Sequence, residues 1–206
     1  MSVSENGVVF VDYRGIRGLV AAKLLTDTAE KIEYDDVRPL CGTSSLSKNT
    51  DTSTATKYYD NIPAIIARGV GPDTVAIDCS AISEENQAWM MGEYYDADAD
   101  MYVEGEPAVG YYAIGYITKK TDGSERFIWR LKGSFSYPES EHNTEDEGTD
   151  STGNSINYTG INTTHKFEKT GKTAKAINMG AAKYDEAKFF AQVLTPDTVA
   201  TALKTT

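Results

Sequence analysis

The sequence has few residues of the kinds that hold metals or form disulfides. Its 206 residues include two cysteines, Cys41 and Cys79, and two histidines, His142 and His165. A structural zinc site takes four soft ligands close together, and the cysteines do not form a Cys-x-x-Cys pair. We therefore expect no metal site, and we predict that Cys41 and Cys79 are buried thiols in their reduced form.

Long apolar runs are also missing. A membrane-spanning helix needs about 18 or more consecutive apolar residues, and no such stretch occurs. Residues 1–7 are polar and lack the basic start and apolar stretch of a secretory signal. We expect neither a membrane span nor a signal peptide.

Positive charge is scarce as well. The chain has 20 Lys and Arg against 31 Asp and Glu, which gives a formal net charge of −11. Proteins that hold DNA or RNA tightly present a basic face, whose binding releases counterions from the phosphates. The charge balance disfavours tight nucleic-acid binding, and it suits a surface that a polyanion passes without sticking.

Residues 171–173 and the two histidines are the first candidates for chemistry. Gly-Lys-Thr at 171–173 resembles the end of a phosphate-binding loop, but Lys166 stands where that loop needs a glycine. Neither His142 nor His165 lies in an apolar or glycine-flanked context that would orient it toward a nucleophile. These residues predict neither nucleotide binding nor nucleophilic catalysis.

Three alternate aspartates are the other candidate. Asp96, Asp98 and Asp100 have the spacing that opens a calcium loop. That loop needs Gly at its sixth place and Glu at its twelfth, and Met101 and Pro107 stand there. A solvated turn is the better interpretation. We predict no catalytic, cofactor-binding or metal-binding residues, and we expect that the chain is not an enzyme.

Short β-branched or alternating segments predict strands in the first half of the chain. Candidates are 8–11, 16–25 (with a helix as the alternative), 32–37 and 75–79, the last preceded by a turn at Gly69 to Pro72. The polar segment 43–57 is either a disordered loop or an exposed strand. We favour the strand, because alternate threonines share one sheet face; they are Thr50, Thr52, Thr54 and Thr56.

The clearest helix and the clearest hairpin follow. Ser83 is a good N-cap and Gly92 a good C-terminal stop, which predicts a helix between them. Asp122-Gly123 tolerates the positive φ angles of a tight turn between strands 111–119 and 126–137. One face of the returning strand is predicted as core, with a stacking platform as the alternative, and the other as facing solvent or a partner. The first face holds Phe127, Trp129, Leu131, Phe135 and Tyr137, and the second holds Ile128, Arg130, Lys132, Ser134 and Ser136.

The last third of the chain alternates acidic, β and helical segments. Six of the twelve residues from 139 to 150 are acidic, so we predict a long acidic loop at about 138–155. A strand over 156–167, a helix over 184–194 and a C-terminal arm at about 176–206 are expected to follow. We predict one domain, 1–206, that is mainly β, a β-sandwich or flattened barrel with one flanking α-helix.

Charge is distributed unevenly along the last part of the chain. Lysines gather after the acidic loop, at 166, 169, 172, 175, 183 and 188. Such runs are most often solvated faces. The alternative hypothesis is that the acidic loop of one copy meets the lysines of another, which would produce head-to-tail association into rings or filaments.

The order of several segments resembles that of a known family. In sequence they are Tyr58-Tyr59-Asp60-Asn61, a Gly-rich turn and strand through Ile77, the helix 83–92, Pro107-Ala108-Val109-Gly110-Tyr111, and the hairpin with Arg126-Phe127-Ile128-Trp129-Arg130 and Tyr137-Pro138. Over roughly residues 35–165 this order resembles the major tail protein, the tail tube subunit, of long-tailed, non-contractile bacteriophages of Gram-positive bacteria.

The resemblance implies a β-sandwich or flattened barrel that polymerises into stacked, hexameric rings. The rings form the virion's tail tube, assembled in the host cytoplasm, through which DNA is ejected. The implied partners are other copies of the chain, the tape-measure protein, the tail terminator and the distal tail proteins. DNA is in transit and not tightly bound, no membrane is involved, and the family brings no cofactor or catalytic residue.

Two further expectations complete this interpretation. Candidate tube-wall residues are the alternate threonines at 50–56 and the polar face of 126–136, although Arg130 and Lys132 argue against a lumen there. The rival hypothesis is a carbohydrate- or receptor-binding β-sandwich module. Its contacts would be exposed aromatics from the tyrosine pairs at 58–59, 94–95 or 111–112.

Overall fold

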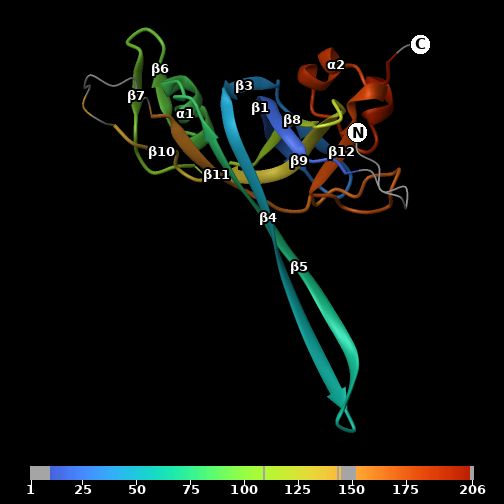
Figure 1. Cartoon of the computed structure of the whole chain (residues 1–206). Helices are drawn as coiled ribbons and strands as arrows, with labels where there is room; N and C mark the ends of the chain where they lie inside the picture. Colours follow the sequence, from blue (N-terminus) through green and yellow to red (C-terminus); the bar gives the residue numbers. More distant parts are fainter. Residues whose placement is uncertain (1–9, 109, 143, 145–151, 205–206) are drawn as a thin grey trace.

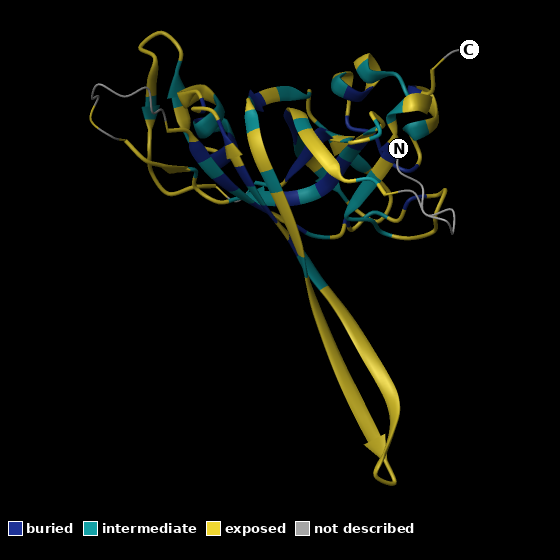
Figure 2. Cartoon of the chain, viewed as in Figure 1, coloured by how far each residue is buried: buried dark blue, intermediate teal, exposed yellow. Residues whose placement is uncertain are grey.

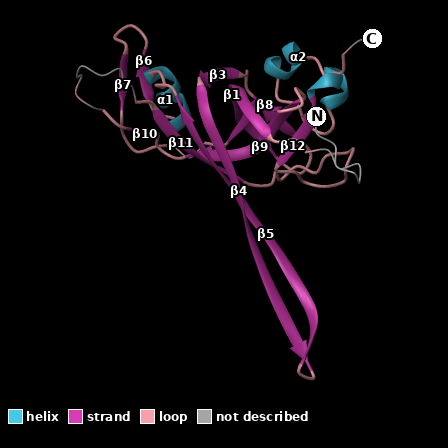
Figure 3. Ribbon diagram, viewed as in Figure 1, coloured by secondary structure: helices cyan, strands magenta, loops and turns pink. Residues whose placement is uncertain are grey.

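The computed structural model describes residues 10–108, 110–142, 144 and 152–204. In these ranges the chain is mainly β, with helices confined to the periphery (Figure 3). The strands are β1 (Tyr13–Asp27), β2 (Ile32–Tyr34), β3 (Arg38–Cys41), β4 (Thr43–Tyr59), β5 (Ile62–Cys79), β6 (Tyr94–Asp96), β7 (Met101–Val103), β8 (Tyr112–Lys120), β9 (Glu125–Phe135), β10 (Glu139–Ser140), β11 (Asn154–Gly160) and β12 (Ala176–Gly180). The α-helices are α1 (Glu84–Met91) and α2 (Glu186–Ala191), and short 3-10 turns span Ala181–Lys183 and Val199–Ala202.

One antiparallel sheet contains every one of these strands except β6 and β7, which pair with each other. Its main path runs β2-β1-β8-β9-β11-β5-β4 (Figure 1). The sheet curls, because β3 pairs with Leu19–Ala21 of β1 and then continues into β4 at the opposite end of the path. Closure is partial: within the described residues, β1 and β4 have no ladder between them.

Two hydrophobic cores lie on the two faces of this sheet. The first contains Val75 and Ile77 of β5 together with Met90 and Met91 of α1. The second contains Trp129 of β9 and is covered by β12, α2 and the residues that follow it. Phe189 of α2 stacks on Trp129 with a ring-centroid distance of 5.3 Å. The C-terminal residues 176–203 thus pack on the sheet, and do not form the extended arm that we expected.

Helix α1 begins where the sequence predicts, and α2 begins two residues later than predicted. The Ser83 side chain accepts a hydrogen bond from the backbone N–H of Asn86, and Gly92 ends α1 with a φ of +68°. Asp185 caps α2 in the same way, accepting from the N–H of Ala187. The helix expected over 184–194 is confirmed but shorter, at Glu186–Ala191, so the described residues include two α-helices and not one.

The β8–β9 hairpin is confirmed, with Gly123 at a φ of +82° in its turn. Phe127, Trp129 and Leu131 are buried as predicted, but Tyr137, expected on the same face, is 42% exposed, and Phe135 packs against the first core instead of the second. The opposite face is not solvent-exposed throughout, because Arg130 is only 6% exposed and Ile128 packs against the first core. Strand β9 is covered on both faces. Its alternating side chains therefore face two cores instead of one core and solvent.

Other strands differ from the sequence prediction mainly in their ends. β1 confirms a strand over the ambiguous 16–25 segment, whereas 32–37 and 156–167 shorten to β2 and β11. In the segment predicted as a strand at 8–11, residues 8–9 lie outside the described residues, and 10–11 precede β1. Of the acidic loop predicted at about 138–155, residues 143 and 145–151 lie outside the described part of the chain, and its two ends pair as β10 and the start of β11.

Candidate assembly surface

The most prominent surface feature is a long two-stranded arm formed by β4 and β5. All residues from 51 to 70 are exposed, and they project from the body as a single hairpin (Figure 2). Nine exposed residues per strand at about 3.3 Å each give the arm a reach of about 30 Å. An isolated two-stranded hairpin is only marginally stable in water, so contact with another surface would stabilise the arm.

A tight turn closes the arm. Asp60 and Asn61 both have positive φ angles, +51° and +63°, and they join Tyr59 to its register partner Ile62. Two central residues with positive φ define the turn whose twist matches that of paired strands. Asn and Asp tolerate this region because their side chains bond locally.

The turn predicted at Gly69 to Pro72 is absent, and β5 runs straight through it. The β4–β5 register shifts between Thr50 and Thr52, so Gly71 and Pro72 lie at a bulge. Pairing with β11 begins only at Asp73, so proline's missing N–H costs no bond on that side. Bulges and edges are where a strand accepts proline.

Large apolar side chains cover much of the arm. The exposed ones are Tyr58, Tyr59, Ile62, Ile65, Ile66 and Val70. Full burial of one such side chain is worth about 1.5–3 kcal/mol. The arm's charges are Asp51, Lys57, Asp60 and Arg68, two of each sign, which cancel. A neutral arm with exposed apolar side chains, on a chain of net charge −11, is a candidate interaction surface.

The predicted polar strand face lies on this arm. Thr52, Thr54 and Thr56 are exposed, as expected, and pair with Val70, Arg68 and Ile66. Directly paired residues share a face, so this face mixes threonines with apolar side chains. Thr50 lies lower, where its hydroxyl donates to Asp73 Oδ1 at 2.9 Å.

An ion cluster around Asp73 fixes the base of the arm. Asp73 is 5% exposed and Arg130 6%, and Arg130 Nη1 donates to Asp73 Oδ2 at 2.8 Å. Lys175 Nζ and Lys48 Nζ lie 3.5 and 3.8 Å from Asp73 Oδ1. Three cations therefore surround one buried carboxylate, from β4, β9 and the segment before β12.

Burial alone would raise the pKa of Asp73. The hydrogen bond from Thr50 and the charges of Lys48, Lys175 and Arg130 outweigh that effect, so the pKa lies below its usual value. The carboxylate is thus held ionised. Lys175 also donates to the carbonyl of Gly71, which ties the bulge to the body.

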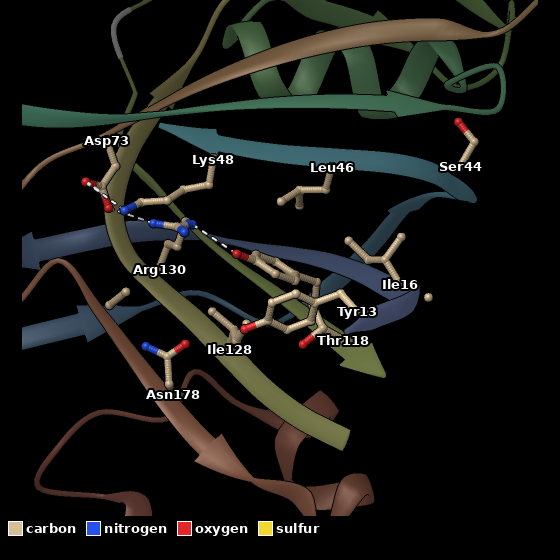
Figure 4. A pocket seen from close by; sticks show the side chains of 13 residues that line it. Tyr13, Ile16, Ser44, Leu46, Lys48, Asp73, Thr118, Ile128, Arg130 and Asn178 are labelled. Atoms are coloured by element: carbon tan, nitrogen blue, oxygen red, sulfur yellow. Dashed lines mark hydrogen bonds and ion pairs between the residues drawn. The ribbon is translucent and has the colours of Figure 1, made fainter. Parts of the chain in front are cut away.

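A cavity of about 720 Å³ opens beside this cluster. Its walls come from the first residues of β1, the first half of β4, and the facing parts of β8, β9 and β12 (Figure 4). It lies where the curled sheet is not closed. Ile16, Leu46 and Ile128 supply apolar wall, and Lys48 and Arg130 lie at one end.

The remaining sequence candidates are scattered. Asp96 Oδ1 accepts the N–H groups of Asp98 and Ala99, which is the solvated turn we expected. No group of three or more His, Cys, Asp or Glu is placed to hold a metal in the described ranges. Cys79 is buried, Cys41 is half-buried, and neither is in a disulfide.

The tyrosine pairs do not form one binding face. Tyr112 is 1% exposed and packs edge-on against Trp89. Tyr94 is exposed on β6, at the far end of the molecule from the arm tip that carries Tyr58 and Tyr59 (Figure 1). The exposed tyrosines expected of the carbohydrate-binding alternative are thus present at 58, 59 and 94, but they do not gather on one face.

Sequence reasoning missed the Asp73 cluster and the arm's extent. A charged residue, Arg130, between the buried Trp129 and Leu131 was the available signal of a buried ion pair. Lys175 belongs to the lysine-rich segment that predicts a solvated face, but its side chain is only 16% exposed.

No protein-family model matches the chain, and no curated protein matches it. No helix among the described residues has the length and apolar character to cross a membrane.

Proposed function

We propose that this chain is a structural subunit that acts by polymerising, as the tail tube protein of a long-tailed, non-contractile bacteriophage. Copies associate into rings, hexameric by the family resemblance, and the rings stack into the conduit for DNA ejection. The segment order described above supports the family, and the exposed arm supports the self-assembly.

The observation that carries the proposal is the arm. It exposes large apolar side chains over residues 58–70 and has free strand edges on both sides. Exposed edges and apolar patches are liabilities in a monomer. They become useful when a second copy covers them, because burial then supplies the free energy of association.

The charge balance supports the conduit. Duplex DNA carries about one negative charge per 1.7 Å of axis, so a cationic lining would retain it. A chain of net charge −11 repels DNA and lets it pass. The charge also keeps single subunits soluble before assembly.

The test is an arm deletion. Residues 52–70 are replaced by Asn-Gly, which closes β4 onto β5 with a two-residue turn. We expect rings or tubes from the wild-type chain in negative-stain microscopy, and only monomers from the shortened chain in sedimentation. Urea unfolding of the body should be unchanged, which shows that the deletion does not act through misfolding.

A matched pair of surface variants separates the arm from apolar exposure in general. Tyr58→Ser with Ile66→Ser removes arm side chains that are 64% and 61% exposed, and Tyr94→Ser with Val103→Ser removes β6–β7 side chains that are 61% and 45% exposed. Only the arm variant should lose assembly. Persistent monomers of the wild-type chain at high concentration, or assembly that survives arm deletion, would overturn the proposal.

A further inference from the structure

The cavity beside the Asp73 cluster is a candidate docking site. Two strand edges flank it, because residues 13–17 of β1 pair only with β8, and residues 44–48 of β4 pair only with β5, among the described residues. Its volume of about 720 Å³ falls within the range of pockets that bury a whole ligand. The opening is a gap in an otherwise continuous curled sheet.

The cavity's chemistry is positive at one end and apolar elsewhere. Lys48 and Arg130 line it together with Asp73 (Figure 4), which leaves one net positive charge on a chain of net charge −11. The Thr118 hydroxyl in its wall is buried without a hydrogen-bond partner. An occupant with one carboxylate, apolar side chains and a hydrogen-bonding group would complement these walls.

The tip of the arm, residues 58–62, has this composition. Tyr58, Tyr59 and Ile62 are 57–64% exposed. Asp60 lies at the apex between them and is the tip's only charge. Asn61, the other turn residue, adds an amide that both donates and accepts hydrogen bonds.

The arm does not reach the cavity of its own chain. β4 and β5 stay paired along the whole arm, from Thr52–Val70 to Tyr59–Ile62, and project away from the body that holds the cavity (Figure 1). The tip and the cavity therefore lie at opposite ends of an arm about 30 Å long. A contact between them joins two copies head to tail, which generates a ring if the rotation closes and a filament if it does not.

We propose that the arm tip of one copy inserts into the β1–β4 cavity of the next copy, with Asp60 directed to Lys48 and Arg130 and the tyrosines against the apolar walls. The inference rests on the proposed function, since it names the surface that receives the arm. This contact spaces successive copies by about the length of the arm.

Directed cross-linking tests the contact. One population of full-length chain carries Ile62→Cys at the tip, and a second carries Thr118→Cys in the cavity, where no hydrogen bond is lost. Mixed, assembled and treated with a short bis-maleimide, they should give about tenfold more dimer than a mixture with Thr26→Cys, because the contact raises the local thiol concentration. Thr26 is a half-buried β1 threonine outside the cavity wall, and wild-type chain reports any contribution of Cys41 and Cys79.

The charge pairing has a separate test. Asp60→Asn should raise the concentration needed for half-assembly by about tenfold and weaken its salt dependence. Asp51→Asn makes the same change at the base of the arm and should leave assembly as in the wild-type chain. Both substitutions are on exposed residues, so neither should alter the fold.

The outcomes separate the two proposals. Tubes that form normally, with no excess cross-linking at Thr118 and with Asp60→Asn equal to Asp51→Asn, would overturn the docking site and leave the assembly function standing. A wild-type chain that stays monomeric would overturn both. Excess cross-linking at Thr118 together with a selective effect of Asp60→Asn supports the site.

Discussion

Strand β5 passes through two environments, and its two halves differ accordingly. From Asp73 to Cys79 it lies between β4 and β11, and Val75 and Ile77 are fully buried. From Ile62 to Val70 it pairs with β4 alone, and every residue is exposed. The inner half alternates apolar and polar residues, whereas the outer half places Ile65 and Ile66 side by side. Hydrophobic packing orders the body, whereas the backbone pairing of β4 with β5 and the tight turn at the tip order the arm.

The largest expected effect is at the boundary between the two regions. Asp73→Asn leaves the buried Arg130 without its counterion, and breaking a buried ion pair on one side costs about 3–5 kcal/mol of unfolding free energy. Asp51→Asn, the nearest exposed aspartate on the arm, should change it by less than about 0.5 kcal/mol. Urea denaturation followed by tryptophan fluorescence measures both, and equal effects would contradict a structural role for the cluster.

Two isoleucines of the same strand sharpen the comparison. Ile77→Ala removes a fully buried side chain and should cost about 2–5 kcal/mol of unfolding free energy. Ile66 is 61% exposed, so Ile66→Ala should cost less than about 0.5 kcal/mol but reduce assembly. The readouts are urea unfolding and sedimentation. An arm variant that destabilises the isolated body would show that the arm is part of its core.

Acid should destabilise the body through its buried carboxylates. The pKa of Asp73 lies below its usual value, and so does that of Asp27, where burial is outweighed by Lys132 and by the N–H groups of Thr164 and His165. Stability from a depressed carboxyl pKa is complete above the unfolded value of about 3.9 and is lost as the pH falls below it. Unfolding free energy should therefore decline below about pH 4.

The variant Asp73→Asn supplies the control for this pH dependence. It should flatten the acid limb, whereas Asp51→Asn should leave the slope unchanged. A slope that Asp73→Asn does not alter would assign the acid sensitivity to other groups.

The smallest expected effect concerns the turn at the arm's tip. Asn61 has a φ of +63°, so Asn61→Gly should stabilise the turn by about 0.5 kcal/mol. Hydrogen exchange of arm amides should slow, with no change in the unfolding of the body. Asn49→Gly, within the body part of β4, should have the opposite sign. Faster exchange in the Asn61→Gly arm would show that the turn is not what orders it.

Sequence patterns predicted the body well because its elements carry local signals. Ser83, Gly92 and Asp122-Gly123 mark a helix start, a helix stop and a hairpin turn by their own chemistry. The arm has weaker signals. Gly71 and Pro72 favour a turn by composition. A strand tolerates them here because they lie at a β-bulge and β11 does not pair with them. The buried Asp73–Arg130 pair joins residues 57 positions apart, and no local pattern encodes such a distance.

The continuity of β5 has a mechanical consequence. A pull on the arm tip travels along the backbone of β5 directly into its ladder with β11, which spans seven residue pairs from Asn154–Cys79 to Gly160–Asp73. The load acts along the strands, so the hydrogen bonds are sheared together instead of being peeled apart one by one. The Asp73 cluster sits at the entry of that ladder, where such a load would first arrive.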